Sequence, residues 1–431
     1  MRRQQERIGY YYSPDDQHYT HHELTSWLPI LESLGARWLT LCASADRAIP
    51  EAFIRALVEA SIEPVIHIDI PMAKLQLERL ETLFAAYRRW GVRYVVASDR
   101  PNLQARWTPN SWGRGALVDR FLDQYLPVLV AQRAAGLIPV FPPLEPGGDY
   151  WDLAFLEAAL RGMLERGQRS LVEELTLGIF LWTYGRPLDW GIGGSASWPE
   201  ARPYHTPAGC QDHRGFRIFE WYAAIARQVA ENALPMLVVA GGETRTGPSG
   251  STGIDPHSET NRAVARLMQS GEAPYYVLNF AFYVLRAGAG GEKAEQAWFP
   301  RPGMPRPVVA AIQQLLVGLD RDGRSESNEE KAFSRYFLLP DVQHAMDDLD
   351  VTAVLELARR SRAVVGCSLR EAARAHEVAL VGDDRALPRE MEDELRRAGC
   401  LVHRLPLYKS ARTTAPAAAD GLPSLDPAMP S

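Results

Sequence analysis

Residues 92–102 have the sequence VRYVVASDRPN, in which an apolar run leads directly into a polar segment that starts near Asp99. The run over residues 92–97 is rich in valine and almost continuously apolar. Such a run is typical of a strand in a parallel sheet that is covered on both faces. We therefore predict a buried strand over residues 92–97, followed by a loop in which Asp99 and Arg100 are candidate functional residues.

Similar runs recur along the chain and alternate with helix-periodic segments. In residues 51–60, Phe53, Ile54, Leu57 and Val58 fall on one face of a helix, and residues 117–135 carry a matching apolar stripe. Eight such alternations that end near residue 318 predict a (β/α)8 TIM barrel. The expected strands cover residues 8–12, 37–42, 64–70, 92–97, 138–141, 175–182, 235–240 and 275–283.

A doubly wound open sheet is the alternative fold with the same alternation. That fold binds nucleotides through a glycine-rich loop after its first strand. Here Gly9 stands alone beside the run at residues 8–12. We therefore favour the barrel and expect no cofactor.

The composition limits the classes of partner. The chain has 431 residues, with 47 Lys and Arg against 53 Asp and Glu and a net charge of -6, so it offers no basic footprint for nucleic acid or an anionic membrane. No apolar run reaches the roughly 18 residues that span a bilayer. The polar start leads into residues 8–12 without the apolar core of a signal peptide. These features predict a soluble, cytoplasmic protein with a polar small-molecule partner.

Metal-site spacing is absent around the cysteines, which are far apart and lack CxxC or neighbouring histidine patterns. We expect reduced thiols and no metal. The cluster of His18, His21 and His22 offers a metal site as an alternative, but a solvated helix start is the interpretation that we favour. The cysteines are Cys42, Cys210, Cys367 and Cys400.

The chain length allows one large barrel and one smaller domain. Residues 320–331 are charged and poor in apolar residues, as expected of a domain boundary. We predict the barrel over residues 1–320, a small α/β domain over residues 331–408, and a disordered tail over residues 409–431, which is rich in Ala, Pro and Ser. The expected elements of the small domain are strands at 332–339, 377–382 and 401–405 and helices at 351–360, 368–374 and 388–398.

Charged and aromatic residues gather at the predicted carboxyl ends of the barrel strands, where barrel enzymes hold their active sites. Carboxylates and guanidinium groups exchange hydrogen bonds with hydroxyls, and flat rings cover apolar C–H faces, so this mixture suits a carbohydrate. Glu145 lies in the rigid turn FPPLEPGG at residues 141–148. The insertion at residues 185–214, which contains Trp190 and Tyr204, is interpreted as a binding loop beside the pocket.

Over residues 8–318 the chain resembles the retaining glycoside hydrolases with an eightfold barrel, which carry an Asn-Glu-Pro motif after strand four and a second glutamate after strand seven. Matched on Pro101, Asp99 falls on the asparagine of the motif and Arg100 on its acid. Matched on the strand, Asp99 takes the place of the acid. Residues 237–242 (LVVAGG) are similar to the end of strand seven, with Ala240 at the nucleophile position and Glu243 three residues later.

The resemblance implies a carbohydrate substrate, and both motifs are degenerate. Hydrolysis needs a protonated carboxyl and a second carboxylate, and arginine cannot donate that proton. Two functions stay open: a glycosidase, and a catalytically inactive carbohydrate-binding or structural barrel. Trp298 with residues 305–316 is similar to the last helix of such barrels. The candidate catalytic residues are Glu243, Glu145 and Asp99, and the candidate substrate-binding residues are Tyr12, Asp69, Arg100, Asn102, Trp182, Tyr184, Trp190, Asn279 and Trp298.

Several candidates also have a structural interpretation. Asp99 and Arg100 can form an ion pair that shapes the loop, and His67 and Asp69 can pair at a strand end. Trp182 suits the core better than a ligand platform. If the insertion at residues 185–214 filled the mouth, a purely structural barrel would be favoured.

Residues 378–405 resemble one repeat of a cell-wall-binding module, in which a strand and a helix lead to a second strand. The likeness rests on VALVG at residues 378–382 and on Leu395, Gly399 and Leu405. Any βαβ fragment can produce this pattern, so we do not infer a wall-bound protein.

Overall fold

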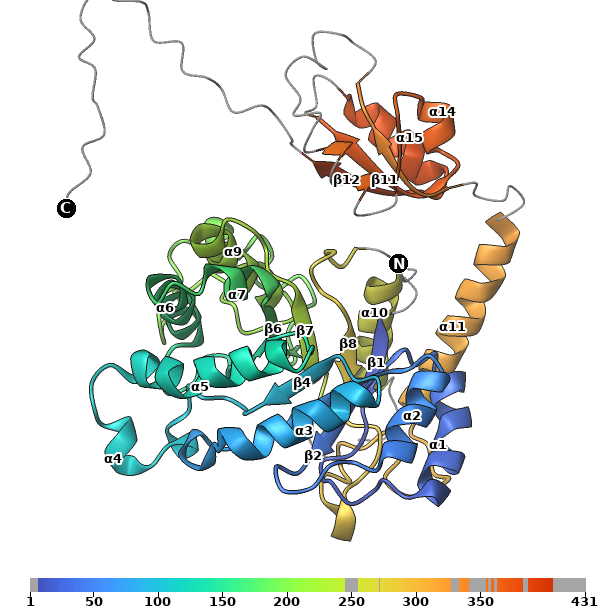
Figure 1. Ribbon diagram of the computed structural model, residues 1–431. Helices are drawn as coiled ribbons and strands as arrows, with labels where there is room; N and C mark the ends of the chain where they lie inside the picture. Colours follow the sequence, from blue (N-terminus) through green and yellow to red (C-terminus); the bar gives the residue numbers. More distant parts are fainter. Residues whose placement is uncertain are drawn as a thin grey trace, which may run out of the picture. The chain divides into compact units, whose positions relative to one another are not determined.

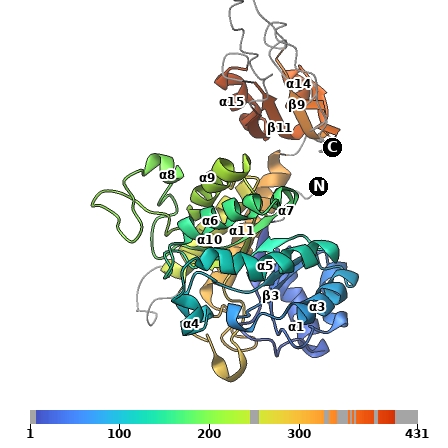
Figure 2. The same ribbon diagram turned by 60° about the vertical axis from the view of Figure 1, so that its left-hand side comes forward.

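The computed structural model describes residues 7–244, 255–270, 272–326, 333–340, 354–355, 358–359, 363–382 and 387–405. The chain divides between Arg321 and Asp322 into two compact units, which Figures 1 and 2 show from two sides. This boundary lies inside helix α11 (Pro307–Glu326), where a linker was predicted. The predicted tail over residues 409–431 lies outside the described residues.

Eight parallel strands are described in the first unit, in the order β4-β3-β2-β1-β8-β7-β6-β5. A parallel bridge between Tyr94 and Ile138 joins the two ends of this sheet, which becomes a nearly closed barrel. The prediction of a TIM barrel is confirmed. The strands are β1 (Ile8–Tyr11), β2 (Trp38–Ala43), β3 (Glu63–Ile68), β4 (Tyr94–Ala97), β5 (Val140–Phe141), β6 (Thr176–Trp182), β7 (Met236–Gly242) and β8 (Phe280–Phe282).

Amphipathic helices alternate with the strands and surround the barrel (Figure 1). In α2, Phe53, Ile54 and Leu57 are buried as their spacing predicts, whereas Val58 is exposed. The helices of this unit are α1 (His21–Ser33), α2 (Glu51–Glu59), α3 (Leu77–Arg89), α4 (Pro109–Trp112), α5 (Leu117–Ala134), α6 (Asp152–Glu165), α7 (Arg169–Glu174), α8 (Gly194–Ser197), α9 (Ile218–Ala230), α10 (Pro256–Ser270) and α11, with 3-10 turns η2 (Met72–Lys74), η3 (Gln104–Arg106) and η4 (Ala289–Gly291).

Strands β5 and β8 are shorter than predicted. For β8 the reason is a side chain, because the Asn279 amide accepts from Val238 N and donates to Val238 O. These bonds to a residue of β7 take the place of regular backbone pairing before Phe280. Before Phe280 the described backbone pairing is therefore limited to an isolated bridge between Met236 and Val277.

Alternation along the strands separates two layers of side chains. On β3, Ile66 and Ile68 join the core between the sheet and the helices, whereas Val65 packs inside the barrel with Tyr94 and Val96. Side chains on a strand point to opposite faces with period two. His67 therefore points into the barrel like Val65, near its carboxyl end.

The second unit contains a sheet of four described strands, all parallel, in the order β10-β9-β11-β12. One face packs Leu338 and Leu380 against Ala372 and Leu395. The predicted small α/β domain after the barrel is confirmed as a fold class. The elements are β9 (Phe333–Leu338), β10 (Val364–Gly366), α14 (Leu369–Ala372), β11 (Ala375–Val381), α15 (Arg389–Arg397) and β12 (Leu401–Leu405).

Strand β10 was not predicted, because three residues are too few to show a pattern. Most of the helix that was predicted over residues 351–360 lies outside the described residues. In the described parts of both units, no helix combines the length and the apolar character that crossing a membrane requires.

Candidate functional site at the mouth of the barrel

A buried polar chain begins at the carboxyl ends of β1, β3 and β4. The hydroxyl of Tyr11 lies 3.0 Å from Nδ1 of His67, and Nε2 of His67 lies 3.7 Å from Oδ1 of Asp99. All three residues are buried. Strands β3 and β4 are neighbours in the barrel, and β2 alone lies between β3 and β1, so residues far apart in sequence meet here. The last separation is too long for a hydrogen bond, and Nε2 of His67 and Oδ1 of Asp99 make no hydrogen bond in the structure.

Arg100 continues this chain outward. Its Nε lies 2.7 Å from Oδ2 of Asp99, its Nη1 lies 3.6 Å from Oε2 of Glu145, and its guanidinium lies 5.6 Å from the ring centre of Phe180. The backbone of Arg100 has φ = 47°, and its N–H donates to the carbonyl of Pro143 at 2.8 Å. This left-handed turn connects the loop after β4 to the loop after β5. The predicted ion pair between Asp99 and Arg100 is therefore present.

The pKa values of the two carboxyl groups beside Arg100 are shifted in opposite directions. Burial alone would raise the pKa of Asp99, but the contact with His67 and the charges of Arg100 and Arg106 outweigh burial and lower the pKa. Burial also raises the pKa of Glu145, and there the opposing charge of Arg100 is not sufficient to reverse the shift. Asp99 is thus held ionised, whereas Glu145 takes up a proton more readily than an ordinary glutamate.

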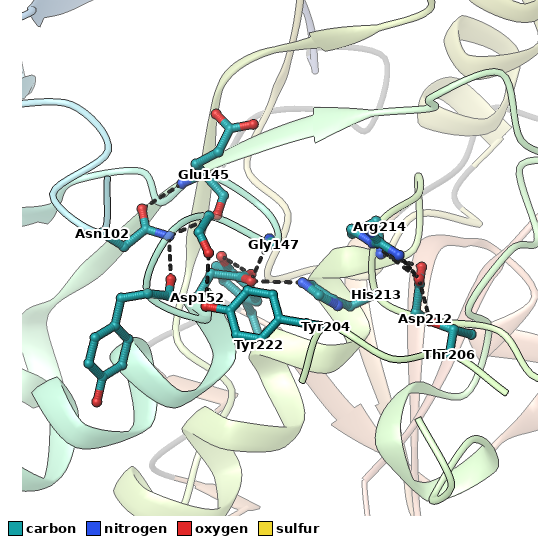
Figure 3. Close-up of polar contacts among 12 residues, drawn as sticks. Asn102, Glu145, Gly147, Asp152, Tyr204, Thr206, Asp212, His213, Arg214 and Tyr222 are labelled. Atoms are coloured by element: carbon teal, nitrogen blue, oxygen red, sulfur yellow. Dashed lines mark hydrogen bonds and ion pairs between the residues drawn. The ribbon is translucent and has the colours of Figure 1, made fainter. Parts of the chain in front are cut away.

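The backbone of Glu145 is clamped by a side chain from the loop after β4. Asn102 accepts from the N–H of Glu145 at 2.9 Å and donates to its carbonyl at 2.9 Å (Figure 3). Asn102 also donates to the carbonyl of Tyr150 at 3.0 Å. Gly148 passes so close that a Cβ there would lie 2.5 Å from Nδ2 of Asn102. The clamp leaves the side chain of Glu145 30% exposed at the mouth.

Glu243, the third candidate catalytic residue, is held differently. Its Oε2 accepts a hydrogen bond from the hydroxyl of Thr183 and another from the N–H of Gly185 at 3.2 Å. Its backbone exchanges hydrogen bonds with the side-chain amide of Asn261. Glu243 is buried, and its carboxylate fixes the start of the loop after β6.

Aromatic rings line the mouth beside the polar chain. The ring of Tyr283 lies edge-on to Tyr11 at 5.2 Å and to Trp182 at 5.5 Å, and Trp182 stacks on Phe180 at 6.1 Å. Burial raises the pKa of Tyr283 to about 12, so its hydroxyl stays protonated at neutral pH. Trp182 and Tyr283 keep partial exposure.

Four of the candidate binding residues are fully buried, and three of them lie away from the mouth. Tyr12 packs edge-on against Trp27 of α1, and Trp298 packs against Tyr10. Asn279 connects β8 to β7, as described above. The fourth, Asn102, serves the clamp on Glu145. We therefore leave all four out of the proposed site: Tyr12, Asn102, Asn279 and Trp298.

The remaining candidates lie in two places. Asp69 is exposed beyond the end of β3, where it pairs with Arg106. It borders a hollow of about 500 Å³ that Asp16, Ser44, Lys74 and Arg79 also line. His67 and Asp69 were expected as a possible pair, but their contacts go to Tyr11 and Arg106 respectively.

The last two candidates are Trp190, inside the insertion at residues 185–214, and Tyr184, which precedes it. Trp190 donates to Asp212 at 3.2 Å and lies under the guanidinium of Arg186 at 4.4 Å, so it takes part in the packing of the insertion. Tyr184, just before the insertion, has 46% of its surface exposed. Tyr184 is thus the more accessible of the two.

Three residues of the mouth were missing from the candidates, namely Tyr11, His67 and Tyr283. The available signal was strand parity, because alternate residues of a strand share a face and His67 follows the inward-facing Val65 by two positions. Placing the end of the first strand one residue late selected Tyr12, which points to the helices.

The early histidines do not gather around a common point. His18 lies 2.8 Å from Glu23 and 3.4 Å from Asp15, whereas His21 and His22 are exposed in the first turn of α1. In the described parts of the chain, no group of three or more His, Cys, Asp or Glu side chains is arranged to hold a metal ion.

Comparison with protein-family models finds no match, and no curated protein matches the sequence. Among solved structures, the chain is similar to a family 39 glycoside hydrolase from Bacteroides cellulosilyticus WH2, with TM-score 0.47 and 11% identity over 72% of this chain and 64% of that one. It is similar to a beta-xylosidase from Caulobacter crescentus CB15, with TM-score 0.46 and 12% identity over 73% of this chain and 68% of that one.

The chain is also similar to a D-psicose 3-epimerase from Clostridium cellulolyticum H10, with TM-score 0.39 and 11% identity over 73% of this chain and 98% of that one. The chain spans less than two thirds of the length of the family 39 glycoside hydrolase. At these scores and identities the likenesses carry no argument about activity.

Proposed function

We propose that the mouth of the barrel binds a carbohydrate, with Arg100 and Glu145 as its polar contacts and Trp182 and Tyr283 as its apolar wall. The observation that carries the proposal is the position of the Arg100–Glu145 pair. The two side chains are 37% and 30% exposed. The Arg100 guanidinium lies over the ring of Phe180, which stacks on Trp182.

The chemistry of this pair suits a polyhydroxylated ligand. A guanidinium donates hydrogen bonds and a carboxylate accepts them, so together they can satisfy adjacent sugar hydroxyls. Aromatic rings pack against the C–H faces of a sugar and leave its hydroxyls free for such contacts. The sequence resemblance of the segments after β4 and β7 to glycosidases supports the same ligand class.

Binding is favoured over retaining hydrolysis because the other two carboxylates are engaged in the fold. Retaining hydrolysis uses two carboxyl groups about 5 to 5.5 Å apart that both reach the sugar. Asp99 is 1% exposed and faces His67 and Arg100. Glu243 is buried and bonded to the loop after β6. Of the three candidate carboxyls, Glu145 has the accessible position.

Hydrolysis is the second candidate function, and one observation favours it. Burial raises the pKa of Glu145, which is the direction that a general acid requires. In this alternative, Glu145 protonates the leaving oxygen. The cytoplasmic location and the lack of a cofactor stay predictions.

The test uses the full chain in a glycan-binding screen together with a panel of aryl glycosides. Glu145→Gln and Arg100→Met should each weaken binding of a glycan hit by roughly tenfold or more, because each removes charge-assisted hydrogen bonds. Glu165→Gln, an exposed change on α6, is the matched control and should bind like the wild type.

The outcomes separate the two functions. Glycan binding that both mouth variants weaken, without hydrolysis of any glycoside, supports the binder. Hydrolysis that disappears in Glu145→Gln but not in Glu165→Gln supports the enzyme. If the wild type neither binds nor cleaves any sugar, the proposed function is wrong.

A further inference from the structure

Asp152 is a fully buried carboxylate that joins three separate segments. Its Oδ1 accepts from the N–H of Gly147 at 2.8 Å and lies 2.8 Å from Nε2 of His213. Its Oδ2 accepts from the hydroxyl of Tyr222 at 2.9 Å. Figure 3 shows these contacts converging on Asp152 from the loop after β5, from the segment next to α9, and from α9 itself. A carboxylate only accepts hydrogen bonds, so His213 donates from Nε2.

A second contact joins the insertion at residues 185–214 to the same loop. The hydroxyl of Tyr204 donates to the carbonyls of Gly148 at 3.0 Å and Asp149 at 2.9 Å. The ring of Trp151 lies edge-on to Tyr204 at 5.0 Å and to His213 at 4.7 Å. The insertion thus contacts residues 147–152 at two places. One is the buried contact of His213 with Asp152, and the other is the exposed contact of Tyr204 with the carbonyls of Gly148 and Asp149.

These contacts act on the loop that carries Glu145. Gly147 lies two residues after Glu145, and the N–H of Gly148 donates back to the carbonyl of Glu145 at 3.0 Å. Asn102 holds the other side of the same turn. The position of the Glu145 side chain at the mouth therefore depends on a turn that is held from two sides.

We propose that His213, acting through Asp152, is a positioning residue for the loop that carries Glu145, and that the insertion is a strap for this loop rather than a ligand platform. The functional importance of where this loop places Glu145 rests on the proposed function, in which Glu145 contacts the carbohydrate. Loss of the His213 donor leaves a buried carboxylate oxygen with one partner fewer, and this incompletely satisfied carboxylate then favours a loop that opens to water.

The test is hydrogen–deuterium exchange of the peptide over residues 144–150 in the full chain. In His213→Leu, the amides of Gly147 and Gly148 should exchange roughly tenfold faster or more, because local opening becomes easier. His213→Gln places an amide N–H near the position of Nε2 and should restore slow exchange. His205→Leu, an exposed histidine of the same insertion, is the matched control and should exchange like the wild type.

A second variant covers the case in which His213→Leu does not fold. Tyr204 is 60% exposed, so Tyr204→Phe removes only its two hydrogen bonds to the loop. It should accelerate exchange of the same peptide by roughly threefold while circular dichroism stays unchanged. Exchange at the wild-type rate in the folded variants of both positions overturns the proposal, as does equal acceleration in His205→Leu.

Affinity for a glycan hit provides the functional measurement. Faster exchange together with weaker binding in His213→Leu, both restored in His213→Gln, supports the positioning role. Faster exchange with unchanged affinity overturns it. If the wild type binds no glycan, the proposed function fails alone, because the exchange data still decide whether the strap holds the loop.

Discussion

Nε of Arg100 lies 2.7 Å from Oδ2 of Asp99, although the two residues are neighbours in the chain. Side chains of consecutive residues at a strand end normally diverge. Here the left-handed backbone at Arg100, with φ = 47°, folds the guanidinium back over the buried carboxylate. The same guanidinium then meets Glu145 from the next strand loop. One arginine therefore neutralises a buried acid and presents its outer edge at the mouth.

Replacement of Arg100 should destabilise the fold. Arg100→Met leaves Asp99 buried with the His67 ring and the charge of Arg106 as its remaining partners, and removing one partner of a buried carboxylate costs about 2 kcal/mol of unfolding free energy when the partner is itself partly exposed. Arg55→Met breaks the exposed ion pair with Glu51 and should cost less than about 1 kcal/mol. Urea unfolding measures both, and equal losses would contradict the special role of Arg100.

Asp99 should make the stability depend on acid. Because its folded pKa is lowered, its contribution is complete above the ordinary value of 3.8 and disappears as the pH falls through the lower folded pKa. The free energy of unfolding of wild type should therefore approach that of Asp99→Asn as the solution is acidified. Urea titrations between roughly pH 6 and pH 2 measure this convergence. A constant difference across the range would show that the pKa of Asp99 is not lowered by folding.

Glu145 should behave in the opposite way. Its folded pKa is raised above 4.5, so the ionised side chain opposes folding at neutral pH, and this penalty disappears as the pH falls through the folded pKa. Glu145→Gln should thus be more stable than wild type at pH 7 by less than about 1 kcal/mol, and the gain should vanish in acid. Thermal unfolding at several pH values checks this. A loss of stability at pH 7 would mean that the pair with Arg100 outweighs burial.

The turn after Glu145 should not tolerate a side chain at Gly148. In Gly148→Ala the new Cβ meets the amide of Asn102 at 2.5 Å and the carbonyl of Glu145 at 3.1 Å, so the clamp must shift, at a cost of about 1–3 kcal/mol. Gly115→Ala is the control, because nothing lies within 4 Å of its Cβ. Denaturant unfolding should show a large loss for the first variant and a change within about 0.5 kcal/mol for the second. Equal effects would argue against the clamp.

The fold could be predicted because buried elements have a recognisable pattern of apolar residues in the sequence. Strands that are covered on both faces must be apolar throughout, and helices that cover them must be apolar on one side. The bounds of the short strands β5 and β8 were harder to predict from this pattern. Asn279 shows why, since its side chain replaces backbone pairing and ends a ladder that the apolar sequence would have continued.

The site was only partly predictable. Asp99, Arg100 and Glu145 were selected because polar residues follow strands, and the structure brings these three together. Tyr12 was the predicted site residue, but Tyr11 is the one that faces the mouth, because a shift of one residue moves a side chain to the opposite face of the sheet. His67 was left out because its contacts, with Tyr11 and Asp99, join residues 56 and 32 positions apart.

The sequence by itself determined that this chain forms a (β/α)8 barrel followed by a small α/β unit and that carboxylates follow several strands. Periodicity and burial are local properties that can be counted along a chain. Only the tertiary structure decided that Asp99 and Glu243 are bound into the fold while Glu145 reaches the mouth. That distinction depends on the side-chain partners Arg100, His67 and Thr183, which backbone turns and loops bring together, and no local pattern records such contacts.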